Sequence, residues 1–294
     1  MEPPEQFASL CSITGGLPGT SQNERTKMQR MTRYYGQNGN GGGHSPASCF
    51  ASRLERYAPL TDEEKGFVAR MEEAERPVKR GEVVLKAGEP STELGVVKEG
   101  WAVARSDRLN GRSQTLRIYL PGEIIGLPGL GIGHYAHEVV MVTQGCICPF
   151  PKDHITGIYA RVPRLAALLT AVASVDQVAL KDRLFMMGSG TARERMAHFL
   201  LDLHERLLLS NPDMGRRFRL PLRQVDIAEV LGLTKVYVNR LLKAFTEEGL
   251  IEIQRPYVRI LRPAELKSMS NYVNRYEQID QSWFPSPARN DISL

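Results

Sequence analysis

The sequence predicts an α+β protein with an N-terminal jelly-roll β-barrel, a long dimerisation helix and a C-terminal winged helix-turn-helix. Three observations predict this architecture. Short β-rich runs separated by glycines occupy residues 82–150, a pattern typical of a jelly roll or barrel. Apolar residues then recur every seven positions over Arg164–Met187, as in a coiled coil. Two short helices joined at a glycine follow at Gln224–Phe245, ahead of two β-rich runs.

Composition and charge indicate a soluble protein with a polyanionic partner. The chain has 294 residues, which predicts two domains, and its 42% hydrophobic content is sufficient for real cores. The net charge of +5 favours a polyanion without specifying one. We expect no membrane contact and no signal peptide, because we find neither a bilayer-spanning apolar run nor a basic, then apolar, N-terminus. Four scattered cysteines favour a reducing, cytoplasmic location.

Residues 1–47 are polar and glycine-rich, and they predict a disordered tail, because they cannot bury enough apolar surface to offset the entropy of ordering. Basic residues of this tail are either loose phosphate contacts or part of a solvated linker. They are Arg25, Lys27, Arg30 and Arg33.

The next predicted domain, residues 48–162, is a β-roll that begins with two short helices. These helices are Ser48–Tyr57 and Thr61–Glu75, and Thr61 with Glu64 forms a capping box for the second. The glycine-punctuated strands that follow are Glu82–Lys86, Leu94–Glu99, Trp101–Arg105, Thr115–Tyr119, Glu138–Thr143 and Cys146–Phe150.

Residues 163–190 are predicted to form a dimerisation helix and a hinge. The apolar repeat places a seam on one face of the helix Arg164–Met187. Its predicted dimerisation residues are Leu165, Leu168, Val172, Val175 and Ala179. The alternative is that this face packs on the β-roll of its own chain. The glycines of Gly188-Ser189-Gly190 predict a break before the next helix, Thr191–Leu209.

The C-terminal domain, residues 191–280, is centred on the two short helices. Gln224–Leu231 ends at Gly232, since glycine enters the left-handed region without steric cost, and Thr234 caps Lys235–Phe245. A wing of two strands is predicted at Leu250–Ile253 and Tyr257–Leu261.

The charge of this domain favours DNA over the simpler alternative, an ordinary helical hairpin with a solvated charged face. Between Arg216 and Arg262, ten basic and five acidic residues give 10 − 5 = +5. A last helix is predicted at Ala264–Tyr276, and residues 281–294 form an irregular tail.

The run GLTKVYVNRLLKAFTEEGLI resembles the helix-turn-helix of the cyclic-AMP receptor/fumarate-nitrate regulator (CRP/FNR) superfamily of bacterial transcription factors. The resemblance covers Leu54 to Ile279. It implies a cytoplasmic homodimer that binds a palindromic site in double-stranded DNA, and an activator of this kind would also contact RNA polymerase. The residues it implies for DNA binding are Thr234, Lys235, Val236, Asn239, Arg240, Lys243, Arg223 and Arg255.

Roles for these residues follow from the family. Its members place the first turns of the second helix against base edges, where Arg240 would bind guanine and Lys235 a guanine or a phosphate. Val236 stands where the family often has a glutamate, so it can offer apolar contact alone. Asn239 either pairs with adenine or is merely solvated.

The resemblance also identifies residues 48–162 as a cyclic-nucleotide-binding-like sensor domain, with a candidate effector pocket at Glu123, Leu127 and His137. Nucleotide-binding members hold the ribose with a glutamate and the cyclic phosphate with an arginine. Leu127 stands at the glutamate position here, and His137 lies near the arginine position. We therefore expect no cyclic AMP binding: the β-roll either senses something else or is locked in an active state.

We predict no cofactor, no metal site and no catalytic residues. Cys11 and Cys49 lack the close spacing that an iron–sulfur cluster requires, and His134 and His137 have no completing ligands nearby for haem. Cys146 and Cys148 are small β-roll residues or, alternatively, a redox or metal pair. We find no Gly-rich phosphate loop, HExxH or nucleophile elbow, so the sequence does not indicate an enzyme.

Two alternative functions stay open. The first is an effector-responsive regulator, with a cyclic nucleotide, haem or redox signal and an altered pocket. The second is a β-roll that binds other proteins, with the winged domain as a dimer scaffold and no specific DNA contact. The basic second helix argues against the latter. The sequence indicates neither the target genes nor the signal, and it does not separate activation from repression.

Overall fold

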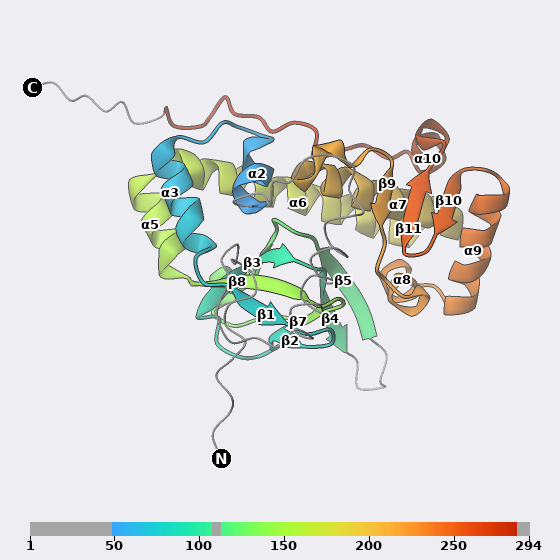
Figure 1. Ribbon diagram of the computed structural model, residues 1–294, viewed down its shortest axis with the longest axis horizontal. Coiled ribbons are helices and arrows are strands. Elements are labelled where there is room, and N and C mark those ends of the chain that lie inside the picture. Colours follow the sequence, from blue (N-terminus) through green and yellow to red (C-terminus); the bar gives the residue numbers. More distant parts are fainter. Residues whose placement is uncertain (1–48, 108–112, 287–294) are drawn as a thin grey trace, which may run out of the picture. The chain divides into compact units, whose positions relative to one another are not determined.

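The computed structural model describes residues 49–107 and 113–286. Within them, two four-stranded antiparallel sheets form a β-roll, a long helix follows, and a helical domain with a three-stranded sheet completes the chain (Figure 1). This arrangement confirms the predicted α+β fold. The predicted tail 1–47, with its basic residues and Cys11, lies outside the described residues, as do residues 287–294 of the C-terminal tail.

The β-roll contains all six predicted strands and two short ones that the sequence did not indicate. One sheet has the order β1-β8-β3-β6 and the other β2-β7-β4-β5. The strands are β1 (Arg76–Val78), β2 (Val83–Leu85), β3 (Glu93–Glu99), β4 (Ala102–Asp107), β5 (Ser113–Tyr119), β6 (Ile124–Ile125), β7 (Glu138–Met141) and β8 (Gly145–Pro151). The unpredicted strands β1 and β6 have three and two residues, too few to show an alternating pattern. Apolar side chains from both sheets, among them Leu85, Val97, Tyr119, Val139 and Ile147, form one buried cluster.

Helices α2 (Cys49–Glu55), α3 (Asp62–Met71) and α5 (Asp153–Arg161) cover the β-roll on the side of β3 and β8. The short helix α4 (Gly129–Ile132) lies in the loop between β6 and β7. The predicted capping box of α3 is present, with Glu64 N donating to Thr61 Oγ1 at 3.2 Å. Phe50, Phe67 and Ile158 belong to the apolar cluster that joins these helices to Leu94 and Phe150 of the sheet.

The long helix α6 (Pro163–Ser189) is two residues longer at its C-terminus than predicted. Gly188 and Ser189 continue the helix, and extended backbone begins at Gly190, so the predicted break lies later than expected. Leu165 and Leu168 are fully buried in the helix cluster of their own chain. These two residues of the predicted dimerisation seam therefore serve the intrachain core, as the alternative interpretation proposed.

By length and composition only, α6 is the one described helix that could cross a membrane, and an 18-residue stretch of it has a mean hydropathy of 1.2. This corrects the expectation that no run reaches that length. The helix is nevertheless held in the fold by ion pairs. Asp176 Oδ2 lies 2.8 Å from Arg117 Nη2, and Asp182 Oδ2 lies 2.7 Å from Arg275 Nε.

The C-terminal domain matches the predicted helices and wing and adds a strand. Its elements are α7 (Ala192–Ser210), the 3-10 helix η1 (Pro212–Met214), β9 (Arg217–Arg219), α8 (Gln224–Leu231), α9 (Lys235–Glu247), β10 (Ile251–Gln254), β11 (Tyr257–Ile260) and α10 (Pro263–Ser270). The wing strands pair as expected, but β9 joins β11 to make a sheet of order β10-β11-β9. The last helix ends at Ser270, earlier than predicted, because Asn271 adopts φ +46°.

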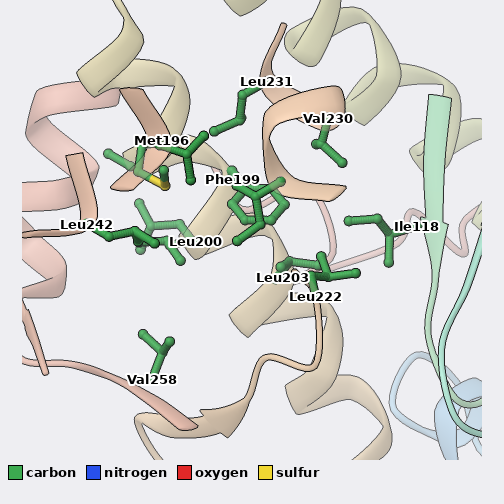
Figure 2. Close-up of a cluster of buried hydrophobic side chains, with 14 of the residues drawn as sticks. Ile118, Met196, Phe199, Leu200, Leu203, Leu222, Val230, Leu231, Leu242 and Val258 are labelled. Carbon is green, nitrogen blue, oxygen red and sulfur yellow. The ribbon is translucent and has the colours of Figure 1, made fainter. Parts of the chain in front are cut away.

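One apolar cluster joins this domain to the β-roll. Figure 2 shows Ile118, from β5, facing three side chains of this domain: Leu203 of α7, Leu222 just before α8, and Val230 of α8. The same cluster contains Val238 and Phe245 of α9. The packing of α8 and α9 is therefore part of a core that extends into the β-roll.

Candidate nucleic-acid interface

The turn between α8 and α9 is formed as the sequence predicts. Gly232 has φ +62° and ψ +37°, a conformation that costs other residues steric strain. Leu233 N donates to Ala228 O at 2.9 Å, which closes the end of α8. Thr234 Oγ1 then accepts from Tyr237 N at 3.2 Å and caps α9. These local contacts fix the direction in which α9 leaves the turn.

Helix α9 divides its residues between a buried and an exposed face. Val238, Leu241, Leu242 and Phe245 are buried in the core around α7 and α8. The predicted DNA-binding residues of α9 all lie on the exposed face: Lys235, Val236, Asn239, Arg240 and Lys243. Val236 is 64% exposed. Exposure of an apolar side chain to water does not stabilise the protein, so this valine is better explained by contact with a partner. The structure thus brings these five residues together on one surface.

Tyr237 also belongs to this surface, and the sequence analysis did not select it. Its side chain is 42% exposed, and its own backbone N–H is the group that Thr234 caps. Tyrosine offers an apolar ring and a hydroxyl that can donate to a phosphate. Its position in the first turn of α9, next to Val236, could have indicated from the sequence that Tyr237 belongs to this surface.

Asn239 is oriented by a partner from α8. Gln224 Nε2 donates to Asn239 Oδ1 at 2.8 Å. Bidentate pairing with adenine requires that same oxygen to accept from the base while the amide nitrogen donates to N7. Gln224 therefore adds a functional group to the interface and constrains how Asn239 can contact a base.

Arg223 has a role in the helix cap. Its Nη2 and Nε lie 2.7 and 3.0 Å from Asp226 Oδ1 and Oδ2, and its backbone N–H donates to Oδ2 at 2.8 Å. Burial would raise the pKa of Asp226, but the bonds from Arg223 lower it, so the carboxyl stays charged. Since Asp226 neutralises it, Arg223 offers less net attraction to phosphate than the sequence suggested.

The remaining predicted cations are at the surface. Lys243 Nζ lies 3.5 Å from Glu247 Oε1, an exposed pair one turn apart that water screens. Arg255 is exposed in the turn between β10 and β11. Within the described chain, no hydrogen bond or ion pair engages the side chains of Lys235, Arg240 or Arg255, which leaves these three groups available to a ligand.

The predicted effector residues lie in three different environments. Glu123 is buried, with Arg53 Nη2 at 2.8 Å from Oε1 and Arg206 Nη2 at 2.7 Å from Oε2. Leu127 packs against the helix cluster around α2 and α3, and His137 is exposed. Arginines enclose this carboxylate, so a ligand that used Glu123 would compete with these ion pairs. The effector role of the three residues stays a prediction.

Nothing in the described residues offers three or more His, Cys, Asp or Glu side chains arranged to hold a metal ion. Cys146 and Cys148 are buried in β8. Burial and then the neighbouring Glu72 raise the pKa of Cys49 to about 12, so this residue is a thiol at neutral pH. A cleft of about 340 Å³ lies between α6, α7 and the end of α10, lined by Phe185, His198 and Met269 among others.

Two known domain families match this chain, one in the β-roll and one in the C-terminal domain. Residues 75–162 match the cyclic nucleotide-binding domain, and residues 194–269 match the Crp-like helix-turn-helix domain. The chain belongs to the CRP/FNR superfamily of bacterial transcription regulators. Members of this superfamily often bind effectors such as cyclic nucleotides, haem or iron–sulfur clusters. This CRP/FNR protein is accordingly a transcription regulator with a helix-turn-helix DNA-binding domain.

Curated relatives of this CRP/FNR regulator match along most of their length. The anaerobic regulatory protein of Aggregatibacter actinomycetemcomitans is 25% identical over 223 residues, which cover 76% of this chain and 86% of the relative. The fumarate and nitrate reduction regulatory protein of Escherichia coli (strain K12) is 24% identical over 212 residues, with 72% and 84% covered.

Solved structures share the fold of this regulator. FixK2 from Bradyrhizobium japonicum superposes with a TM-score of 0.61 at 21% identity and covers 68% of this chain and 98% of its own. A CooA mutant from Carboxydothermus hydrogenoformans gives a TM-score of 0.55 at 19% identity, with 71% and 92% covered.

Proposed function

We propose that this CRP/FNR regulator binds a palindromic operator as a homodimer, places α9 in the major groove and does not require cyclic AMP. The observation that carries the proposal is the exposed face of α9, where Lys235, Asn239 and Arg240 surround Val236. A recognition helix contacts base edges with its N-terminal residues, and its N-terminus attracts the phosphate backbone.

Sequence recognition in this proposal depends on Arg240. An arginine can donate two bonds to O6 and N7 of guanine, a contact worth about 1–3 kcal/mol of discrimination. The side chain of Arg240 is exposed, and Thr234 and Gly232 fix the helix that carries it. Val236 can contact a thymine methyl, and Lys235 adds a less directional contact to guanine or phosphate.

The proposed dimer forms through α6. Its outward face is marked by Leu180 and Leu184, which lie one turn apart and which the rest of the described chain leaves exposed. Val178 and Phe185 are also exposed, but they lie on another side of the helix, where Phe185 lines the cleft with α7 and α10. Leu184 and Phe185 are 62% and 70% exposed, an unusual state for large apolar residues in a helix. A two-fold axis along this face would present two copies of α9 to half-sites about 10 base pairs apart.

Selection of binding sites from random DNA tests the recognition. The wild-type protein is expected to select a two-fold symmetric site, and Arg240→Ala to lose the preference for one guanine in each half. Lys243→Ala is the contrast, because a phosphate contact weakens all sequences alike and reduces the salt slope by about 1. A non-palindromic wild-type site, or an unchanged site for Arg240→Ala, contradicts the proposal.

The independence from cyclic AMP rests on the residues around the predicted pocket. Glu123 is engaged by Arg53 and Arg206, and Leu127 offers no acceptor for a ribose hydroxyl. His137 lies near the position where nucleotide-binding members have the arginine that balances the charge of the cyclic phosphate. Calorimetry should detect no binding at millimolar cyclic AMP, and operator affinity should stay constant when the nucleotide is added. Micromolar binding would contradict this part of the proposal.

We further propose that the protein acts in the cytoplasm, where bacterial DNA lies. Its relatives are bacterial transcription regulators, which act by binding rather than by catalysis. If this regulator is an activator, we expect it to contact RNA polymerase as well.

A further inference from the structure

The segment after α10 crosses from the C-terminal domain to the helices of the β-roll. Figure 1 shows it leaving α10 and running past α6 and α2 toward α3. We call residues 271–286 the C-terminal strap. The strap contains no helix or strand, and it lies beyond residues 194–269, which match the Crp-like helix-turn-helix domain. The match to that domain therefore assigns no role to the strap.

The near end of the strap is anchored in the C-terminal domain. Tyr272 is buried and belongs to the apolar cluster that α7, α8 and α9 share. The rings of Tyr272 and His198 of α7 pack edge to face, with their centroids 5.1 Å apart. Asn274 Nδ2 donates to Glu205 Oε2 of α7 at 3.1 Å. The strap thus begins as a part of this domain.

The middle of the strap passes from one apolar cluster to the other. Arg275 Nε lies 2.7 Å from Asp182 Oδ2 of α6. The next residue, Tyr276, is buried in the helix cluster around α2, α3 and α5. Tyr272 and Tyr276 are four residues apart and belong to different clusters, so the strap joins the core of the C-terminal domain to the helix cluster of the β-roll.

The far end of the strap reaches α2. Gln281 Nε2 donates to the carbonyl oxygen of Tyr57, just after this helix, at 2.6 Å. Ile279 and Phe284 are partly buried and pack against the cluster that contains Phe50 of α2. Ordering a segment without secondary structure costs backbone entropy, so these contacts must offset that cost to keep the strap in place.

The C-terminal domain is therefore attached to the β-roll by two different elements. The first is α7, which packs against Ile118 of β5 and pairs Arg206 with Glu123. The second is the strap, which starts at α10 and ends on α2. Gly190, with extended backbone, separates α6 from α7 and is a place where the domain can turn. Two attachments restrict such a rotation more than α7 does alone.

The surfaces that the proposed function requires stay open while the strap is in place. Lys235, Asn239 and Arg240 of α9 are exposed. Leu180 and Leu184 of α6 are exposed as well. The arrangement that the strap holds is therefore compatible both with DNA at α9 and with a second copy at α6.

We propose that the C-terminal strap holds the C-terminal domain in the arrangement that binds operator DNA. It thereby supplies, from within the chain, the coupling between domains that an allosteric effector can provide. The inference rests on the proposed operator binding without cyclic AMP and adds a mechanism to it. Ile279 and Phe284 are positioning residues, because they act through the orientation of α9. When the competent arrangement is only partly populated, affinity falls by that fraction.

The first experiment weakens the far end of the strap in the full-length protein. Ile279→Ser with Phe284→Ala removes two apolar contacts and leaves the near end at Tyr272 intact. Affinity for the operator that the wild type selects should fall about 5- to 150-fold, the usual range of a coupling between sites. Gln278→Ala is the matched control, an exposed position in the same segment, and should bind like the wild type.

The second experiment measures the orientation of the domain without DNA. Spin labels are attached at Lys79→Cys of the β-roll and Glu265→Cys of α10, two exposed positions. Cys11 is replaced by serine, while Cys49, Cys146 and Cys148 are buried. An excess of unlabelled chains keeps labelled chains apart in dimers. Electron paramagnetic resonance should give a narrow distance distribution for the wild type.

The strap variants are then compared by both measurements. Ile279→Ser with Phe284→Ala should broaden the distance distribution, whereas Gln278→Ala should leave it narrow. Gln281→Ala removes only the hydrogen bond to Tyr57 and should shift both measurements in the same direction by less. This milder variant decides the matter if the double variant does not fold. Phe284→Leu retains an apolar side chain and should keep the wild-type affinity and distribution.

Three results overturn the inference. They are an unchanged operator affinity in the strap variants, a narrow distance distribution in these variants, and an increase in affinity. An increase would mean that the strap holds an arrangement that binds DNA weakly. A wild type that selects no operator, or binds cyclic AMP at micromolar concentration, counts instead against the proposed function, and the distance measurement still tests the strap.

Discussion

At the scale of single residues, Glu123 is a buried charged side chain of the β-roll with three arginines around it. Its carboxylate accepts bonds from Arg53 of α2 and Arg206 of α7, and Arg117 Nη2 of β5 lies 3.4 Å from Oε2. Burial alone would raise the pKa of Glu123, but the three guanidinium groups lower it to about 2. The glutamate therefore joins three elements as a permanent anion.

Substitution of Glu123 tests this role through stability. Glu123→Gln leaves the buried Arg53 without a carboxylate partner and leaves Arg206 with Asp202 alone, and breaking a buried pair in this way costs about 3–5 kcal/mol. Chemical denaturation should show that loss in the free energy of unfolding. Glu89→Gln is the matched control, because its exposed pair with Lys86 is worth about 0–1 kcal/mol. Equal small losses in both variants would contradict a structural role for Glu123.

The same carboxyl predicts a dependence on pH. A carboxyl whose folded pKa is depressed stabilises the native state above its unfolded pKa and loses this contribution as pH falls through the folded pKa. For Glu123 the window runs from 4.5 down to about 2. The difference in unfolding free energy between wild type and Glu123→Gln should therefore shrink across this window and stay constant from pH 5 to 7. A difference that persists unchanged at pH 2 would refute the ion-pair explanation.

At the scale of elements, some glycines end a helix and others continue it, depending on the backbone conformation at that residue. Gly232 terminates α8 with a positive φ, whereas Gly188 lies inside α6 with helical neighbours on both sides. A Cβ added at Gly188 would meet no atom within 4 Å. The two residues look alike in the sequence but have opposite structural roles.

These glycines give opposite predictions for the same substitution. Gly232→Ala forces alanine into the left-handed region, at a cost of about 1–2 kcal/mol, and should lower the melting temperature. Gly188→Ala adds a better helix former without a clash and should raise stability by about 0.5–1 kcal/mol. Thermal denaturation of both variants decides the matter. Destabilisation by Gly188→Ala would indicate a hinge at that residue rather than a continuous helix.

At the scale of the whole molecule, α6 packs against both the β-roll and the C-terminal domain. Arg183 of α6 donates to Thr115 O of β5 at 2.7 Å and to Val230 O of α8 at 3.3 Å. Val172, Val175 and Ala179 are half-buried and pack against the helix cluster of their own chain. The inward face of α6 therefore packs mostly against its own chain. The outward face is the part of α6 that a second copy of the protein can cover.

The proposed dimer is tested by charges on the two faces of α6. Leu184→Glu should give folded monomers in sedimentation and weaken operator binding, because it disrupts the exposed face alone. Val172→Glu should instead lower the melting temperature, since it places a charge at a half-buried position against the intrachain core. If Val172→Glu gives folded monomers and Leu184→Glu stays dimeric, the seam predicted from the sequence is correct and the outward face is not the interface.

Local features of this protein were determined by the sequence itself. The helix-turn-helix boundaries, the Gly232 turn, the Thr234 cap and the capping box at Thr61 follow from neighbouring residues, whose effects act within one helical turn. The exposed set on α9 follows from helical periodicity, because Val238, Leu241 and Phe245 define the opposite face.

Long-range features were decided by the tertiary structure. Two of the three arginine partners of Glu123, Arg53 and Arg206, lie 70 and 83 residues away in the chain, a separation that no local pattern indicates. Strand β9 has three residues, too few for periodicity, and becomes a strand because β11 offers it hydrogen bonds. Helix α6 carries apolar residues on more than one face, so its sequence permits either face to be the inner one. The choice depends on which face fits the β-roll and α7, since apolar side chains are stabilised by whichever surface removes them from water.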